Sequence, residues 1–134
     1  MTEALARQLT RLLGKDRVSS EASVLAEHAA DRWFARQPPA IVVFAESTED
    51  VAKLLKFASR HGIPVTPRGA GVGYVGGCVP SCGGIALSVA RMNRIKEISF
   101  ADAVAVVQPG VITGVLQSEA RRHGLFYPPD PSSL

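Results

Sequence analysis

Hydrophobic residues at the start of the chain recur at helical spacing. Leucines between positions 5 and 13 fall on one helical face, and Gly14 follows as a stop. A serine at position 19 or 20 can cap a second helix that continues to about residue 30. Pro38 and Pro39 then break the chain, so the pattern predicts an N-terminal helical segment over residues 1–37.

The next segment has the pattern of a strand, a helix and a second strand. Residues 41–44 form a short apolar run rich in β-branched side chains, which is typical of a buried strand. The sequence at 47–50 resembles a capping box, and apolar positions over 51–58 line one helical face. Gly62 can end this helix, and Pro64-Val65-Thr66 begins the next strand. A compact β-α-β unit implies a parallel pair of strands and a right-handed crossover.

The later part of the chain has the spacing of short strands followed by a helix. Residues 85–89 are an apolar run typical of a strand, and the runs 95–100 and 103–108 predict an antiparallel hairpin. Residues 113–123 have helical spacing, and Gly124 ends that helix. Together the elements predict an α+β fold with N-terminal helices, a β-α-β unit, a glycine-rich loop, an antiparallel hairpin and a helix.

The segment that separates the β-α-β unit from the following strand is the strongest chemical signal. Residues 69–84 contain seven glycines, which excludes a helix or a central strand. Positions 71–76 fit GxGxxG, but no helix can start directly afterwards, as a Rossmann loop requires, and no Lys-Ser or Lys-Thr follows, as a Walker A loop requires. We therefore expect a cradle of backbone N–H groups for an anion, with Arg68 adding charge at its entrance. A plain glycine-rich connection is the alternative.

Composition narrows the function classes. The 134 residues carry a formal charge of +3 with scattered Lys and Arg, which argues against a nucleic-acid partner. Cys78 and Cys82 are too few for a disulfide framework or a zinc site, so no metal ligand is assigned. His61 and His123 lie at the expected C-terminal ends of two helices, where a cationic side chain interacts favourably with the helix dipole. No signal peptide and no transmembrane run are visible, so we expect a cytoplasmic protein.

Residues 64–77 resemble the first FAD-pyrophosphate loop of the vanillyl-alcohol-oxidase-type (PCMH-type) flavoproteins. The branch it resembles most is the FAD subunit of glycolate oxidase and its D-lactate dehydrogenase relatives. The resemblance covers about residues 38–134 and predicts the first half of an FAD-binding PCMH-type domain, incomplete at Leu134, after the helical segment 1–37. Further matching segments follow in order at 83–88, 91–95, 107–111 and 124–133.

The resemblance implies a bound FAD and a set of residues that contact it. Some relatives anchor the flavin through a histidine at about position 72 or 73, and none is present there, so non-covalent FAD is implied. The family usually has Thr where this chain has Val72. Valine lacks the threonine hydroxyl, so this chain loses one hydrogen bond to the phosphate, worth about 1 kcal/mol. The implied cofactor-binding residues are Arg68, Gly69, Ala70, Gly71, Val72, Gly73, Tyr74, Gly76, Gly77, Pro129, Asp130 and Ser132.

The resemblance also implies an activity. It is the oxidation of a small 2-hydroxy acid of the glycolate or D-lactate type, in which the substrate carbon gives hydride to the flavin and a base takes the hydroxyl proton. In relatives the base and the carboxylate-binding Arg lie in a later part of the protein, so no catalytic residue is assigned here. We expect residues 1–134 alone to be inactive. An iron–sulfur subunit or another electron acceptor is an implied partner, through which the protein would associate peripherally with a membrane.

Two alternatives stay open from the sequence. One is an FAD-linked oxidase of another substrate, such as a sugar or an aromatic alcohol. The other is a non-catalytic product, such as a truncated fragment or one piece of a split protein, because the family continues past the Pro-Asp-Pro-Ser-Ser stretch and this sequence stops at Leu134.

Overall fold

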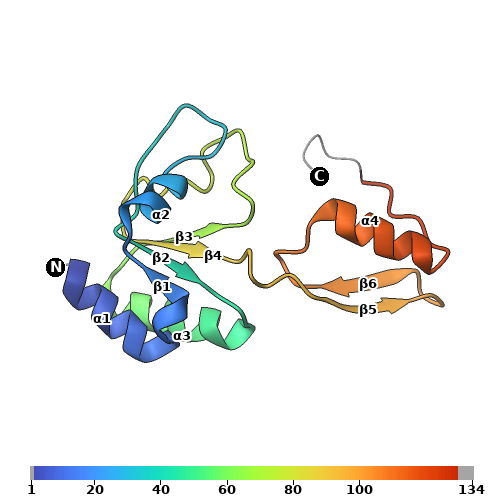
Figure 1. Cartoon of the computed structure of the whole chain (residues 1–134), viewed down its shortest axis with the longest axis horizontal. Helices are drawn as coiled ribbons and strands as arrows, with labels where there is room; N and C mark the ends of the chain where they lie inside the picture. The colour runs from blue at the N-terminus through green and yellow to red at the C-terminus, as the bar shows by residue number, and fades with distance from the viewer. Residues whose placement is uncertain (1, 130–134) are drawn as a thin grey trace. The chain divides into compact units, whose positions relative to one another are not determined.

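The protein consists of two compact units. The computed structural model describes residues 2–129, and the chain divides into a first unit that ends at Arg91 and a second that begins at Met92 (Figure 1). Each unit has its own sheet, so each is described by itself.

A four-stranded mixed sheet organises the first unit. Its order is β1-β2-β4-β3, in which β1 pairs antiparallel with β2, and β4 pairs in parallel with both β2 and β3. The β-α-β unit is confirmed, but its two strands do not pair with each other, because β4 lies between them. The strands are β1 (Val18–Ser19), β2 (Ile41–Phe44), β3 (Val65–Arg68) and β4 (Ile85–Ser88).

Helices cover both faces of this sheet. Figure 1 shows α1 (Thr2–Leu13) and α3 (Thr48–His61) on one side and the short α2 (Ala22–Glu27) on the other. The two central strands are accordingly apolar and buried along most of their length, as expected for parallel strands covered on both faces. Their fully buried residues include Ile41, Val42, Val43, Ile85 and Ala86.

The ends of α3 follow the sequence prediction, whereas α2 does not. The Ser47 hydroxyl accepts a hydrogen bond from Asp50 N at 3.1 Å, and Gly62 ends α3 with a φ of 62°. The second helix was expected from a serine cap to about residue 30, but α2 is only six residues long and has no side-chain cap. Residues Val18 and Ser19 pair with β2 instead, so tertiary pairing overrides the local capping preference.

The second unit is a hairpin and a helix. Strands β5 (Ile95–Ser99) and β6 (Val104–Val107) pair antiparallel, and α4 (Thr113–Arg122) follows, which confirms the predicted order. The buried side chain of Gln108 supports the hairpin, since its Oε1 accepts a hydrogen bond from Arg94 N at 2.9 Å.

The boundary expected between an N-terminal helical segment, residues 1–37, and an FAD-binding domain from residue 38 stays a prediction. In the structure, residues on both sides of that position pack together in the first unit. Strand β1 pairs with β2, and α1 packs against α3.

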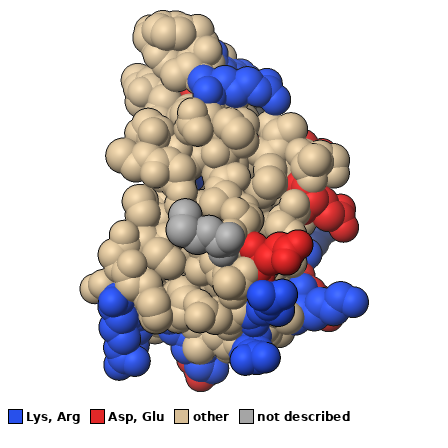
Figure 2. Space-filling view, turned by 90° about the vertical axis from the view of Figure 1, so that its left-hand side faces the viewer, with Lys and Arg blue, Asp and Glu red and all other residues tan. Residues whose placement is uncertain are grey.

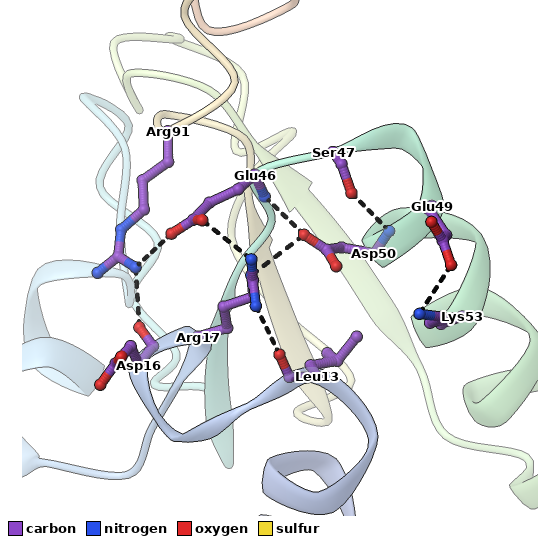
Figure 3. A network of polar contacts seen from close by, with 9 residues as sticks. All are labelled: Leu13, Asp16, Arg17, Glu46, Ser47, Glu49, Asp50, Lys53 and Arg91. Atoms are coloured by element: carbon purple, nitrogen blue, oxygen red, sulfur yellow. Dashed lines mark hydrogen bonds and ion pairs between the residues drawn. The ribbon is translucent and has the colours of Figure 1, made fainter.

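An ion-pair network joins the end of the N-terminal helix to the turn between β2 and α3 (Figure 3). Arg17 lies 3.0 Å from a carboxylate oxygen of Glu46 and 3.2 Å from one of Asp50, and it donates to the Leu13 carbonyl at 2.8 Å. Arg91 reaches the same Glu46 at 3.2 Å. Asp50 is the most buried of the four charged residues, and its Oδ2 also accepts a hydrogen bond from Glu46 N at 3.1 Å.

We expect Asp50→Ala to lower the free energy of unfolding by about 1–3 kcal/mol, because it leaves the Glu46 N–H without its acceptor and removes one of the two carboxylates that pair with Arg17. The measurement is urea denaturation. Glu49→Ala is the matched control on the same helical turn. The Glu49 side chain is 73% exposed and, among residues 2–129, pairs only with Lys53, so its loss should change stability by less than about 0.5 kcal/mol. Equal midpoints for the two variants would contradict this role of Asp50.

Candidate cofactor-binding site

The glycine-rich segment connects β3 to β4 without forming a helix or strand of its own. Residues 69–84 consist of turns and bends in the structure, as the glycine density predicted. None of the backbone N–H groups of residues 70–78 donates a hydrogen bond to another described residue. Backbone donors that are not paired within the protein need water or a ligand as acceptor. A run of such donors on one loop is the arrangement of an anion-binding cradle.

Gly71 packs directly on the side chain of Arg68. It has a φ of 71°, and a Cβ at this position would overlap the Arg68 guanidinium. That guanidinium donates to the Ala30 carbonyl at 2.7 Å and lies 3.4 Å from Cys78 Sγ. No carboxylate of the described residues lies within ion-pair distance of Arg68. Among the described residues, the Arg68 guanidinium therefore contacts neutral groups beside the loop, and no carboxylate neutralises its charge.

Gly84 has a structural role at the other end of the loop. A Cβ on Gly84 would overlap the Pro64 carbonyl oxygen, and its φ is 74°. The Gly84 carbonyl accepts a hydrogen bond from Ala40 N at 2.8 Å, and Ile85 N donates to Pro64 O at 2.9 Å. The starts of β2, β3 and β4 thus meet at this glycine, which fixes where the loop re-enters the sheet.

A segment upstream of β2, residues 30–33, lies along the glycine-rich loop (Figure 1). Arg32 N donates to the Gly73 carbonyl at 2.9 Å. The Arg32 guanidinium donates to the Tyr74 hydroxyl at 2.8 Å and lies over the Tyr74 ring, 5.6 Å from its centroid. Backbone and side chain of one residue therefore bind two consecutive loop residues.

The neighbours of Arg32 also face the loop. Asp31 Oδ1 accepts a hydrogen bond from Trp33 N at 2.8 Å, while Oδ2 is buried and has no partner among the described residues. A Cβ built on Gly73 would lie 3.4 Å from Asp31 Oδ2, and one on Gly76 would lie 3.6 Å from Trp33 Cδ1. The upstream segment therefore follows the loop from residue 73 to residue 76.

The structure brings most of the predicted site residues together. Gly69, Ala70, Gly73, Tyr74 and Gly77 are exposed along the loop, and Gly71, Val72 and Gly76 are half-buried. Pro129 belongs to the second unit, where its carbonyl accepts a hydrogen bond from Gln117 Nε2 at 2.8 Å. Asp130 and Ser132 lie outside the described residues.

Sequence reasoning missed residues 30–33, which it assigned to a helical segment without chemistry. No spacing rule connects them to a loop forty residues later, since the contacts depend on how the chain folds back. The one local signal is the run Asp31-Arg32-Trp33-Phe34, in which charged and aromatic residues stand together outside any helix.

Other candidate groups do not form a second site. Cys78 and Cys82 are free thiols. Within residues 2–129, no three His, Cys, Asp or Glu side chains cluster so as to hold a metal ion, and no helix has the length and apolarity to cross a bilayer. Figure 2 shows one face of the molecule, on which Lys and Arg lie along the lower edge and near the top, and acidic side chains lie mainly on the right-hand side.

A family model described as an FAD binding domain matches residues 39–134. The chain belongs to this family of PCMH-type FAD-binding domains. The match includes the whole glycine-rich loop but not the upstream segment, residues 30–33. It confirms the family inferred from the motifs of the sequence.

Curated relatives agree with this assignment. The chain is 34% identical, over all of its length, to the glycolate oxidase subunit GlcD of Bacillus subtilis and covers 29% of that protein. Over 73% of its length it is 41% identical to a D-lactate dehydrogenase of Anaerostipes hadrus, of which it covers 21%. The chain therefore spans less than a third of the length of these relatives.

Solved structures have the same fold. A 4-ethylphenol oxidase from Gulosibacter chungangensis matches 92% of the chain at a TM-score of 0.80 and 30% identity, and the match covers 25% of the oxidase. An alkyldihydroxyacetonephosphate synthase matches 96% of the chain at a TM-score of 0.86, with 28% of its own length covered. Its 19% identity supports the fold alone.

Proposed function

We propose that this chain is the FAD-diphosphate-binding part of an FAD-linked oxidoreductase that oxidises the CH–OH group of a small 2-hydroxy acid, of the glycolate or D-lactate type. The observation that carries the proposal is the run of unpaired backbone N–H groups over residues 70–78, beside the uncompensated guanidinium of Arg68. The substrate class is supported by the relatives, which are named as a glycolate oxidase subunit and a D-lactate dehydrogenase.

The loop fits a diphosphate on physical grounds. A diphosphate presents several acceptor oxygens and a negative charge, and successive main-chain N–H groups can each donate to it. The glycines leave the main chain uncovered, so a large ligand can lie directly against it. In the proposal residues 68–74, 76 and 77 hold the diphosphate, and Val72 contributes no hydroxyl to it.

The second contact surface is proposed at Pro129, Asp130 and Ser132. Proline restricts the backbone before binding, so less entropy is lost when the stretch is ordered. Aspartate and serine offer polar atoms for the cofactor. A turn with no ligand role has the same composition and is the alternative.

When bound, FAD would supply the acceptor for hydride from the substrate carbon. The residues of this chain would hold and orient the cofactor and keep its diphosphate neutralised. No side chain here is assigned as the base. Its partners are proposed to be the hydroxy acid and an electron acceptor, such as an iron–sulfur subunit, and the word "subunit" in the name of the Bacillus relative favours a multisubunit assembly.

A flavin-linked oxidase of an aromatic substrate is the second candidate. The likeness to 4-ethylphenol oxidase, at 30% identity over most of the chain, favours it. The two candidates share the cofactor loop and differ in substrate. Turnover of D-lactate or glycolate against turnover of an alkylphenol, with one artificial electron acceptor, discriminates them in the complete protein as its gene encodes it.

We expect Gly71→Val and Gly76→Val each to abolish flavin retention in that complete protein. Both positions have positive φ, and a side chain at Gly71 would also displace the Arg68 guanidinium. The measurement is the ratio of flavin absorbance to protein after purification. Gly62→Val is the control, because Gly62 has the same positive φ but open space around it at the end of α3. Normal flavin content in both loop variants would refute the proposed loop.

Acid precipitation should release all of the flavin from the complete protein, because the loop carries no histidine to anchor it. Cys78 is the nearest nucleophile, with its sulfur 3.4 Å from the Arg68 guanidinium. The measurement is flavin absorbance in the supernatant and in the pellet. Colour that stays in the pellet and disappears in Cys78→Ser, but not in Cys82→Ser, would mean that the attachment is covalent.

Residues 1–134 expressed alone should bind FAD weakly and turn over neither D-lactate nor glycolate. The reason is that the chain covers only 29% and 21% of the two curated relatives, so we expect much of the site to come from elsewhere. The measurements are a flavin-fluorescence titration and a dye-linked activity assay. Micromolar binding would mean that this loop suffices, and turnover would make His123 and Tyr127 the first residues to test as the base.

A further inference from the structure

We propose that the upstream segment, residues 30–33, positions the cofactor loop, and that Arg32 acts through Tyr74 to set the affinity for the diphosphate. This inference rests on the proposed function. It concerns residues that precede the part matched by the FAD-binding domain model, which begins at residue 39.

The upstream segment holds the loop at separate points. At one end the Ala30 carbonyl accepts a hydrogen bond from the Arg68 guanidinium at 2.7 Å, next to the end of β3. Two residues later, Arg32 N donates to the Gly73 carbonyl at 2.9 Å. The part of the loop between Arg68 and Gly73 is therefore fastened at both ends to the same short segment.

Arg32 adds a side-chain contact to its backbone contact. Its guanidinium donates to the Tyr74 hydroxyl and also lies over the Tyr74 ring, so the two side chains are held in one orientation. The N–H of the same residue binds the Gly73 carbonyl, so rotation of the Gly73–Tyr74 peptide plane would break that hydrogen bond. Arg32 is engaged with Tyr74, which makes it a positioning residue.

Asp31 keeps the upstream segment in the conformation that reaches the loop. Its Oδ1 accepts a hydrogen bond from Trp33 N, which closes a local turn, and the Trp33 ring then lies against Gly76. The upstream segment thus supports the loop from Gly73 to Gly76 before any ligand arrives.

The physical consequence is a lower entropic cost of binding. A glycine-rich loop loses more conformational freedom on ordering than any other kind of chain. Contacts that already hold such a loop in its binding conformation raise affinity by reducing that loss. Replacing Arg32 should therefore weaken diphosphate binding, although Arg32 is not among the residues proposed to hold the diphosphate.

The first test is hydrogen exchange of the backbone amide of residue 32, which donates to the Gly73 carbonyl, in the FAD-free complete protein, measured by NMR. Arg32→Ala and Tyr74→Ala should each speed this exchange about three- to tenfold, as expected for losing one exposed hydrogen bond and one cation–π contact. The double variant should be no faster than either single variant, because both remove the same contact. Tyr74→Phe keeps the ring and should give a smaller increase.

Arg36→Ala is the matched control. Arg36 is an exposed arginine that follows the upstream segment, and its guanidinium binds the Ala26 carbonyl at 3.1 Å, away from the residues of the loop. Exchange of the residue 32 amide in this variant should equal that in the unmodified protein. Unchanged exchange in Arg32→Ala would overturn the proposal.

The second test is the dissociation constant of FAD in the same variants. Arg32→Ala and Tyr74→Ala should each raise it about three- to tenfold, and the double variant should raise it no further. Effects that add in the double variant would mean that Arg32 acts independently of Tyr74, which overturns the positioning role.

The two tests also separate this inference from the proposed function. Faster exchange in Arg32→Ala together with normal FAD content in Gly71→Val would sustain the positioning of the loop and refute its role as the FAD site. Loss of FAD in Gly71→Val together with unchanged FAD affinity in Arg32→Ala would sustain the site and refute the positioning role.

Discussion

The parallel pairing of β3 with β4 is the constraint on which the rest of the first unit depends. Parallel neighbours cannot be joined by a tight turn, because the chain must return along the full length of the strand, and most proteins make this return with a helix. Here residues 69–84 make it as an irregular loop. The absence of a helix leaves the N–H groups of residues 70–78 without partners within the described chain, so a requirement of topology creates the proposed anion site.

Support for an irregular loop has to come from outside it. A helical crossover would satisfy its own backbone, whereas this loop is held by Arg68 from β3 and by the upstream segment, residues 30–33. The upstream segment lies between α2 and β2 of the first unit. In this unit the residues that follow α1 are joined to the β2–α3 turn by the ion pairs of Arg17 with Glu46 and Asp50. Residues far from the loop therefore determine how well it is ordered.

Local chemistry made about half of this structure predictable. The apolar run at 41–44, the Ser47 cap, the Gly62 stop and the hairpin were all predicted because each depends on residues a few positions apart. The shortening of α2, the insertion of β4 between β2 and β3, and the contact of Arg32 with Tyr74 were not. Each of these features depends on contacts between residues far apart in sequence, and the local spacing of hydrophobic and polar residues does not predict such contacts. The loop was found by composition, but its supports were not.

A crossover without a helix also has consequences for how the family can diverge. A helix that joins two strands must keep its length in whole turns of about 3.6 residues, or its apolar face rotates away from the sheet. An irregular loop has no such period, so single residues can be gained or lost over its exposed middle. Gly84, packed against the Pro64 carbonyl, would still return the chain to the same register of β4. Length variation can then alter the proposed anion site while the sheet stays unchanged.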